Sequence, residues 1–181
     1  MTKTLALTCA LAIALGSTLT ACSNDGGDAG EPPVGNETLA AALADGDSVR
    51  EMSDALKDTG LAQVFDGSAA YTVLAPSNEA LSALEDQNDL STDEGRAVLA
   101  AVLREHVLPG ALTPDDIENA IAVQKGTVSI RTMGEGAMRF AMDGSTLTVT
   151  DESGKTAQVN GDAILASNGV VIPIDGVLKQ P

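Results

Sequence analysis

The sequence predicts an α+β domain over residues 37–181, and three observations support this prediction. In the first half of this range, apolar residues recur every three or four positions behind helix-capping signals, as in amphipathic helices. In the second half, apolar and polar residues alternate between short turns that contain glycine, as in strands. No internal repeat breaks this order. Helices followed by a run of strands favour a mostly antiparallel sheet, folded as a small sandwich, with helices packed at one side or end.

The first predicted helix begins at a capping box, Ser48-x-x-Glu51, in which each side chain can bond the other residue's backbone N–H. Its apolar face consists of Val49, Met52 and Leu56. Gly60 is expected to end this helix, since glycine is common just after the last helical residue.

A strand is predicted next, over residues 70–75, where the run AYTVLA is apolar and rich in β-formers. Pro76 stops this strand because proline has no N–H to donate to a ladder. Ser77 can then cap a helix over residues 78–84, since a serine hydroxyl accepts from the free N–H groups of a first turn.

A second capping box, Ser91-x-x-Glu94, predicts a longer helix that ends at Pro109-Gly110. Its buried stripe, at three- and four-residue spacing, consists of Val98, Leu99, Val102, Leu103 and His106. A short third helix is predicted to open at Thr113 and Pro114, with Thr113 as N-cap and proline at the first helical position.

From Ala120 onward the pattern alternates, and strands are predicted in five segments: residues 121–124, 127–133, 138–151, 155–160 and 170–175. Asp143-Gly144 divides the third segment into a hairpin, because two-residue turns favour Asp-Gly. Pro173 lies within the last segment, which indicates an edge position or a bulge there.

The amino terminus has the pattern of an export signal. Lys3 precedes an apolar stretch over residues 5–15, which is short of a membrane-spanning helix. Residues 19–22, Leu-Thr-Ala-Cys, resemble the lipobox of bacterial lipoproteins, which implies cleavage before Cys22 and lipid attachment to its thiol. The alternative is an ordinary signal peptide with a chance cysteine.

The lipobox reading divides the chain into three parts. Residues 1–21 are a lipoprotein signal peptide, residues 22–36 are a lipidated cysteine with a flexible, acidic Gly/Pro linker, and residues 37–181 are the domain. Acyl chains anchor an exported domain to a membrane without spanning it. We expect this location at the outer membrane or cell surface, or facing the periplasm.

Composition limits the partners and cofactors. The 181 residues carry a formal charge of −16, and only 2% of them are aromatic, so nucleic acid is not an expected partner. One histidine cannot form a two-histidine metal site, and the chain has no calcium-loop or phosphate-loop motif, so we expect no metal and no cofactor. The acidic surface favours a soluble monomer.

Three stretches, in order, resemble the conserved boxes of the fasciclin (FAS1) domain. Residues 71–81 (YTVLAPSNEAL) are similar to its first box, and residues 103–110 (LREHVLPG) to its central Tyr-His segment. Residues 163–181 are similar to its closing box, in which Asn-Gly turns the chain into the last strand. The resemblance implies a wedge-shaped β-sandwich of about seven mostly antiparallel strands with several packed helices. It also implies adhesion at cell surfaces or in matrix.

The positions that match the family motifs are Pro76, Ser77, Asn78, His106, Asn168 and Gly169. We interpret them as structural rather than ligand-binding. His106 is expected to be packed and hydrogen-bonded, holding the helix end to the sheet, and Asn168 to form a turn that tolerates positive φ. The chain departs from the family at Glu105, where tyrosine is usual, and at Pro173, where histidine is usual. Receptor binding of the animal type is therefore not implied.

The leading hypothesis is a membrane-anchored surface lipoprotein whose domain binds a protein or polysaccharide. A non-enzymatic structural or stress factor of the envelope is the first alternative. A hydrolase is the second, although the carboxylate runs at residues 85–86, 93–94, 115–116 and 151–152 fall at caps and loops, where solvated acids are ordinary. We therefore predict no catalytic residues.

Overall fold

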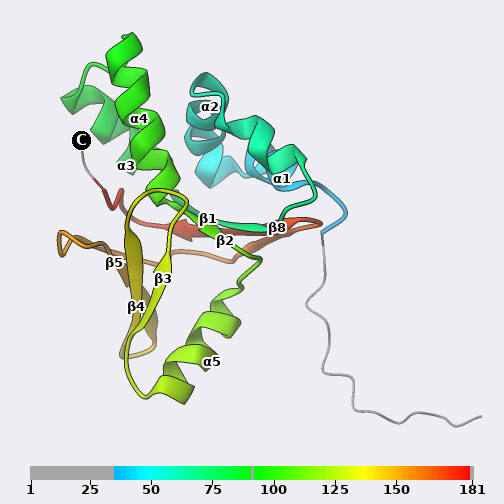
Figure 1. Ribbon diagram of the computed structural model, residues 1–181, viewed down its shortest axis with the longest axis vertical. Helices are drawn as coiled ribbons and strands as arrows, with labels where there is room; N and C mark the ends of the chain where they lie inside the picture. The colour runs from blue at the N-terminus through cyan, green and yellow to red at the C-terminus, as the bar shows by residue number, and fades with distance from the viewer. Residues whose placement is uncertain (1–34, 91, 180–181) are drawn as a thin grey trace, which may run out of the picture. The chain divides into compact units, whose positions relative to one another are not determined.

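The computed structural model describes residues 35–90 and 92–179 of the chain. The predicted signal peptide, Cys22 and most of the predicted linker lie outside the described residues. From Gly35 onward the chain forms a layer of helices, a first sheet, and a second sheet with one further helix (Figure 1).

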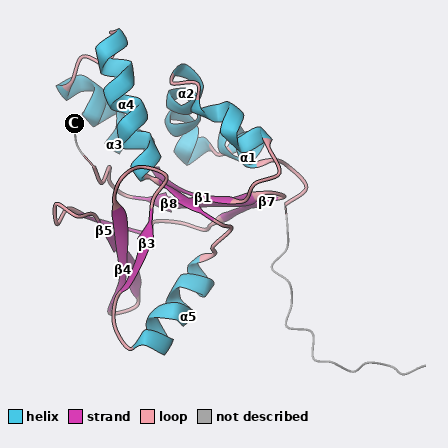
Figure 2. Cartoon of the chain, in the orientation of Figure 1, coloured by secondary structure: helices cyan, strands magenta, loops and turns pink. Residues whose placement is uncertain are grey.

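Two four-stranded sheets form the sandwich (Figure 2). Sheet A, in the order β2-β1-β8-β7, consists of β1 (Tyr71–Pro76), β2 (Val107–Pro109), β7 (Ile164–Ala166) and β8 (Gly169–Ile174). Sheet B, in the order β3-β4-β5-β6, consists of β3 (Val128–Arg131), β4 (Ala137–Asp143), β5 (Thr146–Thr150) and β6 (Thr156–Gln158). Strands β1 and β8 pair in parallel, and the other named pairs are antiparallel. The α+β prediction is confirmed.

Helices lie on both sides of sheet A. The amino-terminal layer consists of α1 (Leu39–Asp45), α2 (Arg50–Asp58), α3 (Asn78–Gln87) and α4 (Asp93–Glu105), with two short 3₁₀ segments, η1 (Asp47–Val49) and η2 (Leu61–Asp66). The remaining helix, α5 (Pro114–Gln124), packs against β3 and β4. Among residues 35–90 and 92–179, no helix is long and apolar enough to cross a membrane.

The two central strands of sheet A separate two hydrophobic cores. Val73 of β1 and Val171 of β8 belong to the core beneath the amino-terminal helices. Leu74 of β1 and Ile172 of β8 belong to the core between the two sheets. Because both faces of these strands are buried, both sequences are continuously apolar rather than alternating.

The two sheets are also joined at their edges. The N–H of Met133, just beyond β3, donates to the carbonyl of Val107 in β2 at 2.7 Å. Near the other edge, Val159 forms an isolated antiparallel bridge with Ile174 at the end of β8. These links restrict how far the two sheets can move apart.

Several local predictions agree with the structure. Thr113 and Asp116 form a reciprocal capping box at the start of α5. Gly60 follows α2 with a φ of 72°, as expected for the residue after a helix end. Asp143 pairs with Thr146 across a two-residue turn whose first residue, Gly144, has a φ of 63°.

Four helix predictions were wrong. Ser48 does not cap α2, which begins after η1 and has no side-chain cap from its own N-cap residue. The N-cap of α4 is Thr92, which accepts from Gly95 N at 3.0 Å; Ser91, predicted for this role, lies outside the described residues. The same helix ends at Glu105 instead of Pro109-Gly110, because the chain turns there into β2. Val98, assigned to its buried stripe, is 37% exposed.

The predicted strands also need correction. Residues 121–124 belong to α5, since Ile117 and Ile121 are buried at helical spacing while Val123 is 81% exposed. The short elements α1, β2 and β7 were not predicted. Pro173 lies in β8, an internal strand, but beyond Val171, the last β8 residue that pairs with β7. The missing N–H of Pro173 is tolerated because the hydrogen-bond ladder between β7 and β8 has already ended at Val171.

Candidate functional site

The first family motif connects the end of β1 to a helix and to β8. Pro76 is in register with Ile174, the last residue of β8. Ser77 donates its N–H to the carbonyl of Ile174 at 2.9 Å. Its hydroxyl accepts from Ala80 N at 3.4 Å and so caps α3, as the sequence indicated.

Asn78, the next motif residue, caps a different helix from across the layer. Its Oδ1 accepts from Glu51 N in the first turn of α2 at 3.1 Å, and its Nδ2 donates to Asp47 O at 2.8 Å. Asn78 therefore satisfies a free N–H of α2, the role that local sequence rules gave to Ser48.

His106 is fully buried at the C-terminal end of α4. Its Nδ1 lies 2.9 Å from the carbonyl oxygen of Val102, and its Nε2 accepts from Leu178 N at 3.0 Å. This pattern requires the neutral ring with its proton on Nδ1. Both ring nitrogens are occupied by backbone groups, so the ring is not free to act as a base for a serine nucleophile.

The surroundings of His106 favour its neutral form. Burial lowers the pKa of His106 below its ordinary 6.5, and the charge of Lys155 acts in the same direction. The Val102 carbonyl and the carboxylates of Glu105 and Asp151 oppose this shift without reversing it. A protonated ring would also set a second N–H against the N–H of Leu178.

Asn168, between β7 and β8, joins three segments of the chain. Its Oδ1 accepts from Leu39 N at 2.7 Å, at the start of α1. Its Nδ2 donates to the carbonyls of Phe65 at 2.8 Å and Gly67 at 2.7 Å, at the end of η2. The expected positive φ was wrong, since Lys125 is the one non-glycine residue of the described chain with positive φ. The side chain, rather than the backbone geometry, calls for asparagine here.

Gly169 follows at a close backbone approach. A Cβ at this position would lie 2.2 Å from the carbonyl oxygen of Tyr71 in β1 and 3.0 Å from Cδ2 of Leu39. No side chain can occupy that space without moving the strand. Glycine is therefore required by packing against β1.

A buried carboxylate, which the sequence showed only as a departure from the family, lies beside His106. Glu105 is 6% exposed and accepts from the hydroxyl of Thr132 at 2.6 Å. It also accepts from the N–H groups of Glu135 at 3.1 Å and Gly136 at 3.3 Å. A Cβ on Gly134 would lie 2.5 Å from the Glu105 carboxyl carbon. The turn after β3 thus surrounds this carboxylate. Its glycines, Gly134 and Gly136, were interpreted from the sequence only as turn residues, but they also leave room for the Glu105 side chain.

Two cavities adjoin Glu105. One of about 500 Å³ lies between α4 and the Glu105-binding turn and is lined by Val98, Ala101, Val102, Arg104, Glu105, Gly134, Glu135 and Lys179. The other, of about 220 Å³, lies toward Asp151 and Ser153. Asp151 is itself buried and accepts from Ser153 Oγ at 2.7 Å and Lys155 N at 2.8 Å, so it holds its own loop together.

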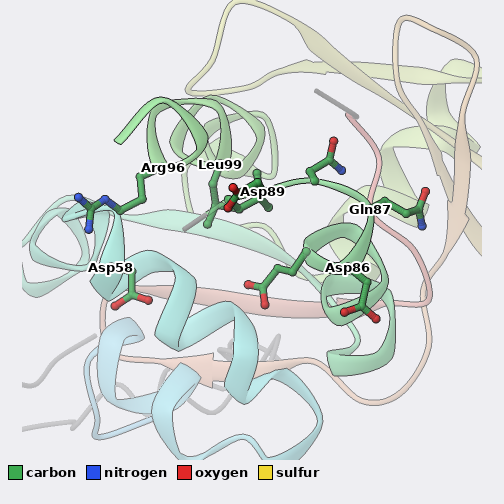
Figure 3. Close-up of a pocket in the computed structure, with 9 residues that line it drawn as sticks. Asp58, Asp86, Gln87, Asp89, Arg96 and Leu99 are labelled. Carbon is green, nitrogen blue, oxygen red and sulfur yellow. The ribbon is translucent and has the colours of Figure 1, made fainter. Parts of the chain in front are cut away.

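An acidic pocket of about 690 Å³ lies among the ends of α2, α3 and α4 (Figure 3). Its lining is Asp58, Glu85, Asp86, Gln87, Asn88, Asp89, Leu90, Arg96 and Leu99. Burial raises the pKa of Glu85, with further contributions from the carboxylates of Glu51, Asp58 and Asp86. The described residues of the lining include no histidine, hydroxyl or thiol nucleophile. Nowhere in the described chain do three His, Cys, Asp or Glu side chains form a group that could hold a metal.

The other predicted carboxylate runs lie at helix starts. Asp93 and Glu94 are in the first turn of α4, and Asp115 and Asp116 are in the first turn of α5, where they favourably oppose the positive ends of the helix dipoles. Hydrogen bonds from Thr113 lower the pKa of Asp116. These acids stabilise helix ends. Cys22, the predicted lipid site, lies outside the described residues.

The chain belongs to the fasciclin-domain family, whose model matches residues 47–181. A solved FAS1 domain pair from the insect cell adhesion molecule fasciclin I is similar to it with a TM-score of 0.61 and 27% identity, covering 74% of this chain and 46% of that structure. Protein sll1483 of Synechocystis is 29% identical over 83% of this chain and 72% of its own length.

Two animal proteins share the domain within much longer chains. Stabilin-1 of Homo sapiens is 26% identical over 84% of this chain but only 6% of its own length. Transforming growth factor-beta-induced protein ig-h3 of Sus scrofa is 30% identical over 73% of this chain and 18% of its own length. This chain is therefore similar to only one region of each of these two proteins.

Proposed function

We propose that this chain is an exported lipoprotein, anchored to a membrane through Cys22, whose fasciclin domain acts by binding a protein or polysaccharide at the cell surface or in the surrounding matrix. The observation that carries the binding function is the family membership over residues 47–181. The similar solved domain pair comes from a cell adhesion molecule, which supports the same class of function.

The arrangement of polar side chains supports binding over catalysis. The single histidine has both ring nitrogens bonded to backbone groups. Among the described residues, carboxylates and an arginine line the acidic pocket, and no nucleophilic side chain does. A binding domain needs only a complementary surface, whereas a hydrolase needs a positioned acid, base or nucleophile.

Membrane anchoring is supported by residues 19–22, which have the lipobox pattern behind an apolar stretch. Fractionation of cells that produce the full chain tests this part of the proposal. The wild type is expected in the membrane fraction and Cys22→Ala in the soluble exported fraction. Cys9→Ala is the matched control, because Cys9 lies within the predicted signal peptide and its replacement leaves the anchor unchanged. Membrane retention of Cys22→Ala contradicts the anchor.

The binding function is tested by deleting the gene and measuring attachment of cells to surfaces and to one another. Loss of attachment, restored by the wild-type chain, is the expected result. A fragile envelope with normal attachment contradicts adhesion and favours the structural alternative.

A further inference from the structure

The two faces of sheet B differ in composition. Side chains alternate between the faces of a strand, and cross-strand partners share a face. The inner face holds Val128, Met138, Phe140 and Val149, all of which belong to the core between the sheets. The outer face therefore holds the residues between them, beginning with the cross-strand partners Ser129 and Arg139.

The outer face is lined with arginine, hydroxyl and amide side chains. Arg139 is opposite Thr150 on β5, and Thr150 in turn is opposite Thr156 on β6. The hydroxyls of these two threonines lie 2.9 Å apart. Arg131, Arg139, Thr156 and Gln158 are exposed, so these parts of the face are open to solvent. Thr148, at its centre, is buried and donates its hydroxyl to the carbonyl of Ala141 at 2.9 Å.

The charge of this face is opposite to that of the chain. The whole chain carries a formal charge of −16, yet the outer face bears two arginines and one carboxylate, Asp143, at the end of β4 beside the hairpin turn. Within the described chain, the ion pairs use Arg50, Lys57 and Arg96, and neither Arg131 nor Arg139 has a carboxylate partner. Both guanidinium groups are available to an external anion.

We infer that the outer face of sheet B binds a polysaccharide that bears carboxylate groups; this inference rests on the proposed binding function and names the surface and the partner class. A guanidinium group binds a carboxylate through two parallel hydrogen bonds. Thr150, Thr156 and Gln158 can donate to and accept from sugar hydroxyls.

The composition of the face favours a polysaccharide over a protein partner. Protein interfaces depend on aromatic and other large apolar residues at their centres. The outward positions of β4 before Asp143 are Ala137, Arg139 and Ala141, and those of β5 are threonines. A polar surface of small residues suits an extended hydroxylated chain.

The spacing of the two arginines fits a polymer. Arg131 is opposite Ala137 and Arg139 is opposite Ser129, so the arginines are diagonal neighbours on adjacent strands. Diagonal neighbours in an antiparallel pair are about 7–8 Å apart at their backbones. Two flexible arginines at this separation can hold two acidic groups of one chain. Acidic residues on other faces are screened beyond about 8 Å at physiological ionic strength.

The test measures binding of the full chain, purified in detergent, to polygalacturonate, with dextran as the neutral polymer and double-stranded DNA as a different polyanion. The expected result is saturable binding to polygalacturonate that weakens with salt, and little binding to the other two. Arg131→Gln with Arg139→Gln should reduce the affinity about tenfold or more, because two charge-assisted contacts are lost. Arg50→Gln with Arg96→Gln, which removes the same charge elsewhere, should leave the affinity unchanged.

A near-isosteric change provides an independent test of the same face. Gln158→Glu adds a negative charge on the same face, on β6, two strands from Arg139, and should weaken binding of a polymer that crosses these strands. Gln63→Glu in η2 should not. Equal affinity of the Arg131/Arg139 double variant and the wild type overturns the inference, and so do equal binding to DNA and absence of polygalacturonate binding.

Cell attachment separates failure of this surface from failure of the proposed function. If the deletion strain loses attachment but cells with the Arg131/Arg139 double variant keep it, the domain is adhesive through another surface. If deletion itself leaves attachment unchanged, the proposed function fails whatever the polysaccharide result.

Discussion

The helical layer over sheet A and the outer face of sheet B use polar side chains in opposite ways. In and next to the helical layer, Asn78 of α3, His106 after α4 and Asn168 of the β7–β8 turn bond to backbone atoms of distant segments. On sheet B, Arg131 and Arg139 are exposed and have no carboxylate partner in the described chain. We propose that the family motif positions build the fold and that binding depends on positions outside the motifs.

The largest loss of stability is expected for Asn168→Ala. Its side chain bonds three backbone groups in two other segments, and the change leaves them without partners in a half-buried site. The free energy of unfolding should fall by about 2–4 kcal/mol. Urea unfolding measures this, with the exposed Asn160→Ala as control. A loss no larger than that of the control would mean that Asn168 does not hold the helical layer to the sheet.

The second effect is a pH dependence that arises from His106. Because its pKa is lowered in the folded protein, the unfolded chain takes up the proton first as pH falls. The contribution of the neutral ring is complete above about pH 6.5 and is lost below it, by up to about 1.4 kcal/mol per pH unit. His106→Gln should be less stable at pH 7 but should show a flatter profile between pH 7 and 5. Parallel profiles of the two proteins would refute this role.

Asn78 provides a smaller and more specific test of the same layer. Asn78→Ala removes the cap of α2 and should cost about 1–2 kcal/mol of unfolding free energy. Ser48→Ala should cost less than about 0.5 kcal/mol, because Ser48 makes no capping bond to that helix. A larger loss for Ser48→Ala than for Asn78→Ala would mean that Ser48, as the sequence predicted, caps α2.

Local patterns predicted the elements whose determinants are close in sequence. The Thr113 N-cap, the Ser77 cap and the Asp143-Gly144 hairpin each depend on a few adjacent residues. The strand predicted at residues 121–124 was wrong because a pattern of four residues fits both a strand and a helix. Only the burial of Ile117 and Ile121 decides between the two. The short strands β2 and β7 have too few residues to show a period.

The candidate site was predictable in its positions but not in its partners. Resemblance to the family identified Asn78, His106 and Asn168, yet their hydrogen bonds reach segments far away in the sequence. The sequence showed Glu105 only as a departure from the family's usual tyrosine. Its surroundings could not be predicted, because they form when Thr132 and the following glycines fold back onto α4. The arginine-bearing face likewise depends on strand register, which alternation alone does not fix.

The smallest expected effect on stability belongs to the outer face of sheet B. Arg131→Gln with Arg139→Gln should change the unfolding free energy by less than about 0.5 kcal/mol, since both side chains are exposed and lack ion-pair partners in the described chain. Thermal unfolding measured beside the binding assay checks this. A loss above 1 kcal/mol would mean that these arginines support the sheet instead of serving an external partner.

The central claim is that the helical layer stabilises the fold while the outer face of sheet B binds the polysaccharide. Its most direct test is the polygalacturonate affinity of the Asn78→Ala variant, measured at a temperature at which this variant remains folded. The account predicts the wild-type affinity despite the lower stability, because Asn78 bonds only within the helical layer. A folded Asn78→Ala protein that has lost binding would contradict it and would place recognition at the family motif.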